Sequence, residues 1–337
     1  NPADFIDLIS SRSETYAQPA ALPRVKLGSL YEDLHRRDFT INAMAVRLNG
    51  QGVGELIDPL DGREDLEHGL MRVLHPNSFI DDPTRLFRLV RYAERYGFNF
   101  ESKTEAILPS ALGYVDQLSP ERLRHELDLI LEEENFLPML EKLWAYRILQ
   151  QVTPALPFDE ATRARLDESR LGFSIPQDTV PSEISKIRNR LWIAWLMGLS
   201  GKGIRALGKR MHFTADLLKQ CLGASSLLQV LDSFAGFHPS ECVARLDKFP
   251  LESVLVVSSC APNMGLRPIL QKYLKEWKGV KPDTTGETLM LLGVPFGLRI
   301  GEILWRLRAA WLDGELTNAA EEHELLDRLM REQRKTK

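Results

Sequence analysis

A run of charged and amide side chains stands directly before an apolar segment early in the chain. Residues 36–42 read Arg-Arg-Asp-Phe-Thr-Ile-Asn, and the apolar run continues to Val46. Arginine guanidiniums are planar, always charged and suited to bidentate contacts with phosphate, while a neighbouring Asp and Asn can pair with ribose hydroxyls. Arg37, Asp38 and Asn42 therefore indicate a nucleotide pocket, with a surface ion cluster as the alternative.

The next polar cluster, residues 81–95, has the pattern of one amphipathic helix. Pro83 predicts its start, because proline suits the first helical turn. The apolar residues recur at the spacing of one buried face and the arginines fall opposite them: Leu86, Leu89, Val90 and Ala93 against Arg88, Arg91 and Arg95. Guanidiniums gathered on one face need anions or acidic neighbours, so this face predicts a phosphate-binding ladder, with a solvated charged face as the alternative.

The start of the same helix carries a carboxylate and a guanidinium close together. Asp82 stands where the helix dipole favours negative charge, and Arg85 lies between the buried and the charged face. Side chains of these two types read base edges in other proteins by accepting and donating hydrogen bonds. The pair is therefore a candidate for reading a nucleobase.

These clusters need a mixed scaffold followed by helices. Residues 4–9 have strand composition, and the β-prone runs 39–48 and 54–57 flank a hairpin-type turn at 49–52, so the first 75 residues are predicted to be α+β. From Pro83 onward the periodicity is helical. A helix start is predicted at Ser119-Pro120, and its apolar stripe consists of Leu123, Leu127, Ile130 and Leu131. The Pro-rich stretch 154–181 is predicted to be an irregular connection with a short helix and an internal boundary.

Four segments together resemble one enzyme family, the class II tRNA nucleotidyltransferases with their poly(A) polymerase relatives. Residues 36–42 resemble its ribose and triphosphate motif, 57–62 (Ile-Asp-Pro-Leu-Asp-Gly) its central Asp-Gly motif, 81–85 its nucleobase motif and 118–122 (Leu-Ser-Pro-Glu-Arg) the start of its helical neck. They occur in the family's order over about residues 1–150. The tail, from Gly293 to Glu322, is similar more weakly.

The resemblance implies an α+β fold in four parts. Residues 1–75 would be the C-terminal part of a polymerase-β-like nucleotidyltransferase head, and 76–153 a helical neck with the nucleotide-recognition helix. Residues 154–280 would form a helical body and 281–337 a helical tail. The implied reaction is template-independent addition of CMP and AMP, or of the last A alone, to the 3′ end of tRNA.

The resemblance also implies roles for single residues. Asp82 and Arg85 would face the incoming base, so that protein side chains select C or A. Arg37, Arg88 and Arg91 would hold the triphosphate, and Asp38 with Asn42 would sense the ribose. Asp58 and Asp65 would stabilise the fold rather than touch the nucleotide.

Two departures from the family pattern are visible. Asp81 stands where the family usually has Glu. The Gly-rich strand and turn with the Asp-x-Asp pair, which would hold Mg²⁺ for phosphoryl transfer, are not in these residues and are expected upstream of Asn1. The parent protein is therefore predicted to catalyse and this chain by itself is not, while Asp7 is either an auxiliary acid or a structural residue.

The expected substrates are ATP and CTP. Residues 10–33 resemble the family's mobile loop, which here contains Glu14 and Tyr16, and residues 16–23 look more like A-adding than CCA-adding members. The order and identity of the added nucleotides stay open at this point.

Bulk properties set further expectations. The 337 residues carry a net charge of only −4, so tRNA would be bound by local basic clusters or not at all. The candidate clusters are Lys202, Lys209 and Arg210; Lys272, Lys275 and Lys278; and Arg299, Arg306 and Arg308. No apolar run approaches the length that spans a bilayer, a cytoplasmic location is expected, and the three scattered cysteines are predicted to be buried thiols. The tryptophan pairs at 192 and 195 and at 305 and 311 are predicted to be core residues.

Two other functions share these motifs. A poly(A) polymerase built on the same head and neck would use the same pocket and make a longer product. A non-catalytic RNA-binding helical module would keep the motifs only as scaffold. The oligomeric state is left open by the sequence.

Overall fold

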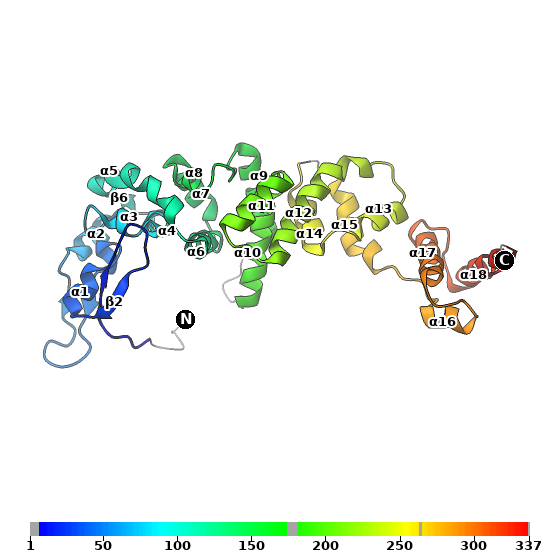
Figure 1. Ribbon diagram of the computed structural model, residues 1–337, viewed down its shortest axis with the longest axis horizontal. Coiled ribbons are helices and arrows are strands. Elements are labelled where there is room, and N and C mark those ends of the chain that lie inside the picture. The colour runs from blue at the N-terminus through cyan, green and yellow to red at the C-terminus, as the bar shows by residue number, and fades with distance from the viewer. Residues whose placement is uncertain (1–6, 174–180, 263–264, 336–337) are drawn as a thin grey trace. The chain divides into compact units, whose positions relative to one another are not determined.

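The computed structural model describes residues 7–173, 181–262 and 265–335. The chain forms two compact units, and Figure 1 traces its elements from blue to red. The first unit consists of Asn1–Asp167, Phe173–Leu191 and Arg205–Thr214, and the second of Glu168–Gly172, Trp192–Ile204 and Ala215–Lys337. Short strands occur only in the first unit among the described residues, so the predicted α+β class with a mainly helical remainder is confirmed.

The first unit begins with three pairs of short strands. β1 (Arg12–Thr15) and β2 (Arg24–Leu27) form an antiparallel hairpin, β3 (Ala45–Val46) pairs with β4 (Leu56–Ile57), and β5 (Leu70–Met71) runs parallel to β6 (Asn99–Phe100). Between and after them lie α1 (Leu30–His35), the 3₁₀ turn η1 (Thr40–Asn42), α2 (Gly62–His68), α3 (Ser78–Asp81), α4 (Thr84–Tyr96), α5 (Ser102–Ala111), η2 (Leu112–Gln117), α6 (Pro120–Leu131), α7 (Phe136–Ala145) and α8 (Ile148–Val152).

The remaining elements are helical. They are α9 (Glu160–Phe173), α10 (Pro181–Leu196), α11 (Gly201–Arg210), α12 (Ala215–Val230), η3 (Leu231–Phe234), α13 (Pro239–Leu246), α14 (Leu251–Cys260), α15 (Arg267–Lys275), η4 (Trp277–Gly279), α16 (Gly286–Leu291), α17 (Leu298–Leu312) and α18 (Ala319–Lys335). The division of the chain into head, neck, body and tail at residues 75, 153 and 280 stays a prediction.

The helix starts predicted from local signals are confirmed. Pro83 is the N-cap of α4, and the Ser119 hydroxyl accepts a hydrogen bond from the Arg122 amide at the start of α6. The apolar stripes of both helices are fully buried and pack against each other in the core of the first unit: Leu86, Leu89, Val90 and Ala93 with Leu123, Leu127, Ile130 and Leu131. This packing fixes the face of α4 that carries its arginines.

Several strand predictions are wrong. Residues 1–6 lie outside the described residues, and Asp7, Leu8 and Ile9 are exposed without regular structure, so the predicted first strand is not formed there. Residues 40–42 instead form η1, in which the Ala43 amide donates to the Thr40 carbonyl, and α2 packs against this turn before the short β3. The hairpin itself is confirmed by the pairing of β3 with β4.

The predictions for the helical part are mixed. The stretch 154–181 contains α9, whose 14 residues make it longer than the short helix expected, and residues 174–180 lie outside the described part. Trp192 and Trp195 are fully buried and stacked with their centroids 5.2 Å apart, as predicted. Trp305, by contrast, is 36% exposed with the Arg308 guanidinium beside its ring, so its assignment to the core is wrong. All three cysteines are buried free thiols.

A separate apolar cluster closes the C-terminal end of the second unit. It joins α16, α17 and α18 through Leu289, Val294, Ile303, Leu307, Ala310, Leu316, Leu325 and Leu326. Within it Glu322 of α18 is fully buried and accepts hydrogen bonds from Thr284 and from the Trp311 indole. The Glu322 carboxylate is thus satisfied by hydrogen bonds from neighbouring residues of the same unit.

Candidate nucleotide-binding pocket

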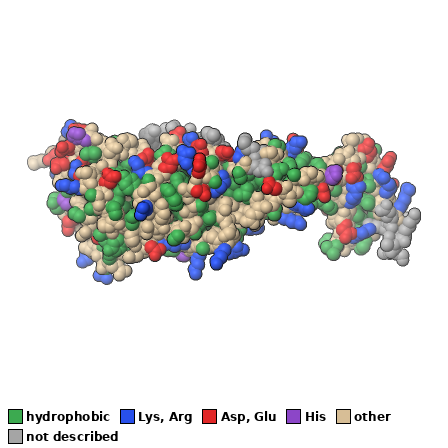
Figure 2. Space-filling model, turned by 90° about the horizontal axis from the view of Figure 1, so that it is seen from above, with side chains coloured by type: hydrophobic (Ala, Val, Ile, Leu, Met, Phe, Trp, Pro, Cys, Tyr) green, Lys and Arg blue, Asp and Glu red, His purple; other side chains and the backbone are tan. Residues whose placement is uncertain are grey.

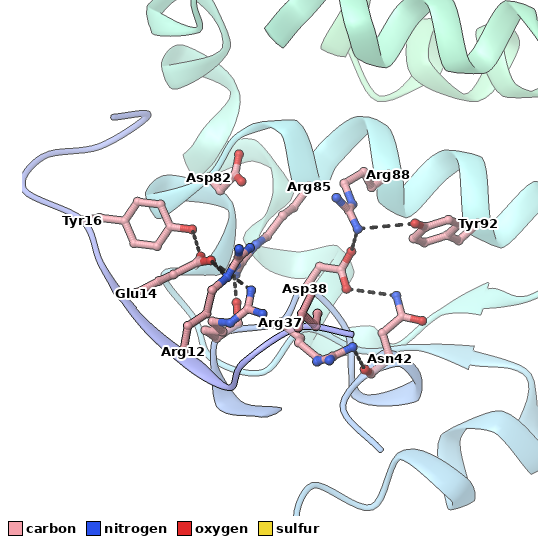
Figure 3. A pocket seen from close by; sticks show the side chains of 12 residues that line it. Arg12, Glu14, Tyr16, Arg37, Asp38, Asn42, Asp82, Arg85, Arg88 and Tyr92 are labelled. Atoms are coloured by element: carbon pink, nitrogen blue, oxygen red, sulfur yellow. Dashed lines mark hydrogen bonds and ion pairs between the residues drawn. The ribbon is translucent and has the colours of Figure 1, made fainter. Parts of the chain in front are cut away.

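One pocket of about 520 Å³ gathers most of the residues singled out in the sequence. It lies within the first unit, where the hairpin β1–β2, the segment after α1 and the start of α4 converge (Figure 3). Its lining consists of Ile9, Arg12, Glu14, Tyr16, Arg36, Arg37, Asp38, Asn42, Asp82, Arg85, Arg88 and Tyr92. Five arginines among twelve lining residues make this a site suited to a polyanion.

Asp38 connects the first polar cluster with the arginine face of α4. Its Oδ1 accepts a hydrogen bond from Asn42 Nδ2 at 2.9 Å, and its Oδ2 lies 2.7 Å from Arg88 Nη2. Burial lowers the pKa of the Arg88 guanidinium, but the Asp38 carboxylate outweighs this and raises that pKa above its ordinary value. Arg88 thus keeps its positive charge, and Figure 3 shows its guanidinium beside Asp38 in the pocket.

Arg36 and Arg37 are oriented by carboxylates of the hairpin and of α1. Arg36 Nη1 lies 2.9 Å from Glu14 Oε1 and its Nη2 lies 2.8 Å from Asp33 Oδ1. Arg37 Nη2 reaches Asp33 Oδ2 at 3.1 Å, and its Nη1 donates to the Asn42 carbonyl. Asp33 therefore holds both guanidiniums in place, which preorganises positive charge for an anionic ligand.

Asp82 and Arg85 both line the pocket and are held by different neighbours. Asp82 Oδ1 accepts from the Thr84 amide at 3.0 Å and from Arg122 Nη2 at 2.6 Å. Arg85 is only 5% exposed, and it donates to Ser78 Oγ at 2.6 Å and to the Arg36 carbonyl at 2.8 Å. These bonds use two of the five guanidinium donors, so the pair can still offer both a donor and an acceptor to a ligand.

Two predicted site residues are not brought into the pocket. Arg91 of α4 is 8% exposed, lies over the Tyr92 ring and points to Glu133 at 3.9 Å. Asp7 is exposed and precedes the lining residues. The assignments of Arg91 to the triphosphate and of Asp7 to an auxiliary acid therefore gain no support from the pocket's geometry, and both stay predictions.

Some lining residues were not singled out by the sequence. No sequence motif around Arg12 marks it as a pocket residue. It lines the pocket because β1, which begins at Arg12, pairs with β2. Tyr92 stands one helical turn after Arg88, and its hydroxyl lies 3.4 Å from Arg88 Nη2, a spacing that could have identified it. Tyr16, placed in the expected mobile loop, lines the pocket, and burial raises the pKa of its hydroxyl.

The central Asp-Gly motif lies beneath the pocket as scaffold. Asp58 accepts from the amides of Gly62 and Arg63, both at 2.8 Å, and Asp65 binds Arg72 and the Thr40 hydroxyl. A Cβ at Gly62 would lie 2.2 Å from the Thr40 carbonyl oxygen, so only glycine allows α2 to pack against η1. These contacts agree with the structural role expected for Asp58 and Asp65.

The acidic side chains of the described residues form no large cluster. No group of three or more His, Cys, Asp or Glu side chains within 7–173, 181–262 and 265–335 could hold a metal ion. The pocket carboxylates Glu14, Asp38 and Asp82 each pair with an arginine instead.

The arginines of the predicted tRNA-binding clusters mostly contact the chain itself. In the first unit Arg210 donates to the carbonyls of Leu118 and Asp116. In the second unit Arg306 pairs with Glu315 and Arg308 with Asp247. On the face that Figure 2 shows, Lys and Arg side chains are interspersed with Asp and Glu. None of the described helices is long and apolar enough to cross a membrane.

Two family models match the chain. Residues 2–72 match the poly A polymerase head domain, and residues 97–159 match a probable RNA and SrmB-binding site of polymerase A. An A-adding tRNA nucleotidyltransferase from Halalkalibacterium halodurans is 32% identical, over 93% of this chain and 71% of that protein. The chain belongs to the class II tRNA nucleotidyltransferase family. The prediction of this family from the four motifs is thereby confirmed.

Other members of the family are similar over most of the chain. An A-adding tRNA nucleotidyltransferase from Geobacter sulfurreducens is 32% identical over 96% of this chain, which spans only 38% of that protein's length. The Thermotoga maritima CCA-adding enzyme complexed with tRNA is 26% identical with a TM-score of 0.73, over 90% of this chain and 74% of that one. CCA-adding enzyme complexed with ATP is 28% identical with the same TM-score, over 88% of this chain and 72% of that one.

Proposed function

We propose that the parent protein of this chain adds the terminal AMP to the 3′ end of tRNA without a nucleic-acid template. The observation that carries the proposal is the placement of Asp82 and Arg85 in one pocket with Arg37 and Arg88. The relatives from Halalkalibacterium halodurans and Geobacter sulfurreducens, which match by sequence, are A-adding tRNA nucleotidyltransferases, and this supports AMP over a full CCA end. The Thermotoga maritima CCA-adding enzyme, whose structure is complexed with tRNA, supports tRNA as the acceptor.

The pocket's charges are suited to hold the nucleotide from two sides. Arg88, held by Asp38, and Arg37, held by Asp33, supply positive charge to the triphosphate. Asn42 donates to the same Asp38, and we assign it to the ribose hydroxyls. These residues bind the parts that all nucleotides share, so they fix position without choosing the base.

Base choice falls to the remaining pair. Adenine and cytosine both carry an exocyclic amino donor next to a ring-nitrogen acceptor, whereas guanine and uracil present a carbonyl and an N–H there. The Asp82 carboxylate accepts from the amino group and the Arg85 guanidinium donates to the ring nitrogen. Guanine and uracil would leave both side chains facing groups of the wrong polarity, which costs binding free energy.

Phosphoryl transfer of this kind would use Mg²⁺, which would be held by an Asp-x-Asp pair and would supply charge neutralisation at the phosphates. The described residues contribute binding and orientation of the nucleotide. ATP and CTP as substrates, tRNA as the acceptor and a cytoplasmic location of the protein follow from the family and are part of this proposal.

Nucleotide addition to defined tRNA ends tests the proposal. The full-length protein is incubated with ATP and CTP and with tRNAs that end before CCA, after the first C or after CC. An A-adding enzyme extends only the tRNA ending in CC, and by a single A. Extension of all three to CCA would replace it by a CCA-adding enzyme, and absence of any product would overturn the enzymatic function.

A poly(A) polymerase is the second candidate, because both family models that match the chain are named for that polymerase. The same incubation separates the two functions by product length. A polymerase continues past the terminal A, and its product lengthens with time. A single added nucleotide that does not grow on prolonged incubation excludes it.

A further inference from the structure

Arg122 of α6 lies outside the pocket lining and yet contacts a base-facing residue. Its Nη2 donates to Asp82 Oδ1 at 2.6 Å, and its Nη1 donates to the Ala20 carbonyl at 3.0 Å. The Arg122 side chain is 18% exposed, as is that of Asp82. One planar guanidinium thus joins the neck helix, the nucleobase motif and the loop between β1 and β2.

The contact with Asp82 is confined to one carboxylate oxygen. Oδ1 also accepts from the Thr84 amide at 3.0 Å and from the Thr84 hydroxyl at 2.5 Å. Among the described residues no hydrogen bond reaches Oδ2, and that atom is not sealed off from solvent. Because the terminal torsion of an Asp side chain is broad and roughly two-fold, the bonds on Oδ1 decide which oxygen remains for a ligand.

The contact with Ala20 ties the loop to the same place. Ala20 has a left-handed backbone with φ of 59°, which costs free energy for a residue with a Cβ. Its amide donates to the Ile80 carbonyl of α3 at 3.3 Å, and the residue is 7% exposed. Ile80 precedes Asp82 by two residues, so the loop, α3 and α6 meet around the Asp82 carboxylate.

We propose that Arg122 is a positioning residue for base selection, which holds Asp82 Oδ1 so that Oδ2 alone faces the nucleobase. The inference rests on the proposed function, in which Asp82 reads the base. Lysine is a poor substitute, because a single ammonium lacks the fork that reaches the Ala20 carbonyl and Asp82 Oδ1 together. Loss of Arg122 leaves Asp82 Oδ1 held by Thr84 alone and removes the charge-assisted bond that fixes the orientation of the carboxylate.

The test measures kcat/KM for ATP and for GTP with the full-length protein on tRNA ending in CC. Arg122→Ala is expected to reduce the preference for ATP over GTP by about tenfold or more, since a charge-assisted hydrogen bond has been removed from the base reader. The preference of Arg122→Lys for ATP over GTP should lie between those of the wild type and Arg122→Ala. Arg124→Ala is the matched control, because Arg124 lies on the same helix with similar exposure and pairs with Asp128 outside the pocket.

A double-mutant cycle separates positioning from general damage to the fold. In an Asp82→Asn background, Arg122→Ala is expected to change the ATP to GTP ratio less than about twofold, because a residue acting through Asp82 has nothing left to position. An unchanged ratio in Arg122→Lys and Arg122→Ala, or an equal drop in Arg124→Ala, would overturn the inference. If the wild-type protein adds no nucleotide at all, the proposed function itself is overturned. This outcome differs from one in which the wild type is active and only the Arg122 variants behave unexpectedly.

Discussion

Two buried glutamates in different regions of the molecule have opposite surroundings. Glu126 of α6, in the first unit beside the pocket, is 6% exposed, and its Oε2 has no hydrogen-bond partner among the described residues. Burial raises its pKa to about 7 although Arg88 and Arg91 act in the other direction. Glu322 of α18, in the second unit, is fully buried and accepts hydrogen bonds from Thr284 and Trp311.

The two carboxyls differ in how completely their hydrogen-bonding capacity is satisfied, and their pKa values shift in opposite directions. Burial alone would raise the pKa of Glu322, but the hydrogen bonds to its ionised form outweigh burial and lower it. A carboxylate satisfied by its own chain stabilises the fold and has nothing to offer a ligand. Around Glu126 the buried Nε atoms of Arg88 and Arg91 also have no hydrogen-bond partner among the described residues, so this polar cluster beside the pocket is only partly satisfied by the chain.

The largest effect is expected from Glu322→Ala. Removing the carboxylate leaves the Thr284 amide, the Asp283 amide and the Trp311 indole without their acceptor, which costs about 3 kcal/mol or more. Hydrogen exchange of α16, α17 and α18 should accelerate accordingly, while the Kd for ATP stays unchanged. Glu324→Ala, an exposed site on the same helix, serves as control. Unaltered protection of these helices would contradict the account of Glu322.

A smaller effect, with a defined pH dependence, is expected from Glu126→Gln. The folded state holds the proton up to a pKa of about 7, whereas the unfolded chain releases it near 4.5, so ionisation favours unfolding as pH rises through this window. Wild-type stability should therefore fall between pH 4.5 and 7 relative to the variant, by at most about 3 kcal/mol. Asp82, Arg88, Arg91 and Arg122 are the charged groups that act on this carboxyl.

Hydrogen exchange of α4 and α6 across pH measures the effect in the unit that contains Glu126. For Glu322 the dependence of stability on pH should have the opposite sign. A carboxyl with a lowered pKa loses its stabilising contribution as pH falls. Equal pH profiles for wild type and Glu126→Gln would show that the carboxyl ionises as freely in the folded state as in the unfolded one.

The smallest effects are expected from the pocket arginines, and they appear in binding rather than in stability. Arg88→Ala should weaken the binding of ATP and CTP alike by about tenfold, since it removes a pocket charge that the proposed function assigns to the phosphates. Arg85→Ala should change the ratio between ATP and GTP instead. Equal losses for every nucleotide in both variants would remove the separate roles assigned to these side chains.

Two further variants of α4 complete this set, with nucleotide Kd as the readout. Arg95→Ala is the matched control, because Arg95 pairs with the Glu133 carboxylate, away from the pocket. Arg91→Ala tests the role implied for Arg91 by the family resemblance. Because Arg91 lies outside the lining, its loss should affect nucleotide binding less than the loss of Arg88. A tenfold increase in the nucleotide Kd of Arg91→Ala would support the assignment of Arg91 to the triphosphate.

The sequence by itself determined the family, the course of α4 and α6 and most of the pocket. The residue order in segments 36–42 and 81–85 carries the family motifs, and Pro83 and Ser119-Pro120 mark helix starts by local chemistry. The apolar periodicity of both helices is a local property as well. Such features are readable because each depends on residues only a few positions apart.

Only the tertiary structure decided which charges meet. Asp38 reaches Arg88, Glu14 reaches Arg36, and Arg122 reaches both Asp82 and Ala20, across separations that leave no periodic signal in the chain. It also turned Arg91 toward Glu133 and left Asp7 exposed without a strand. These outcomes depend on how helices and hairpin pack, and packing is set by the combined burial of many side chains rather than by any local pattern.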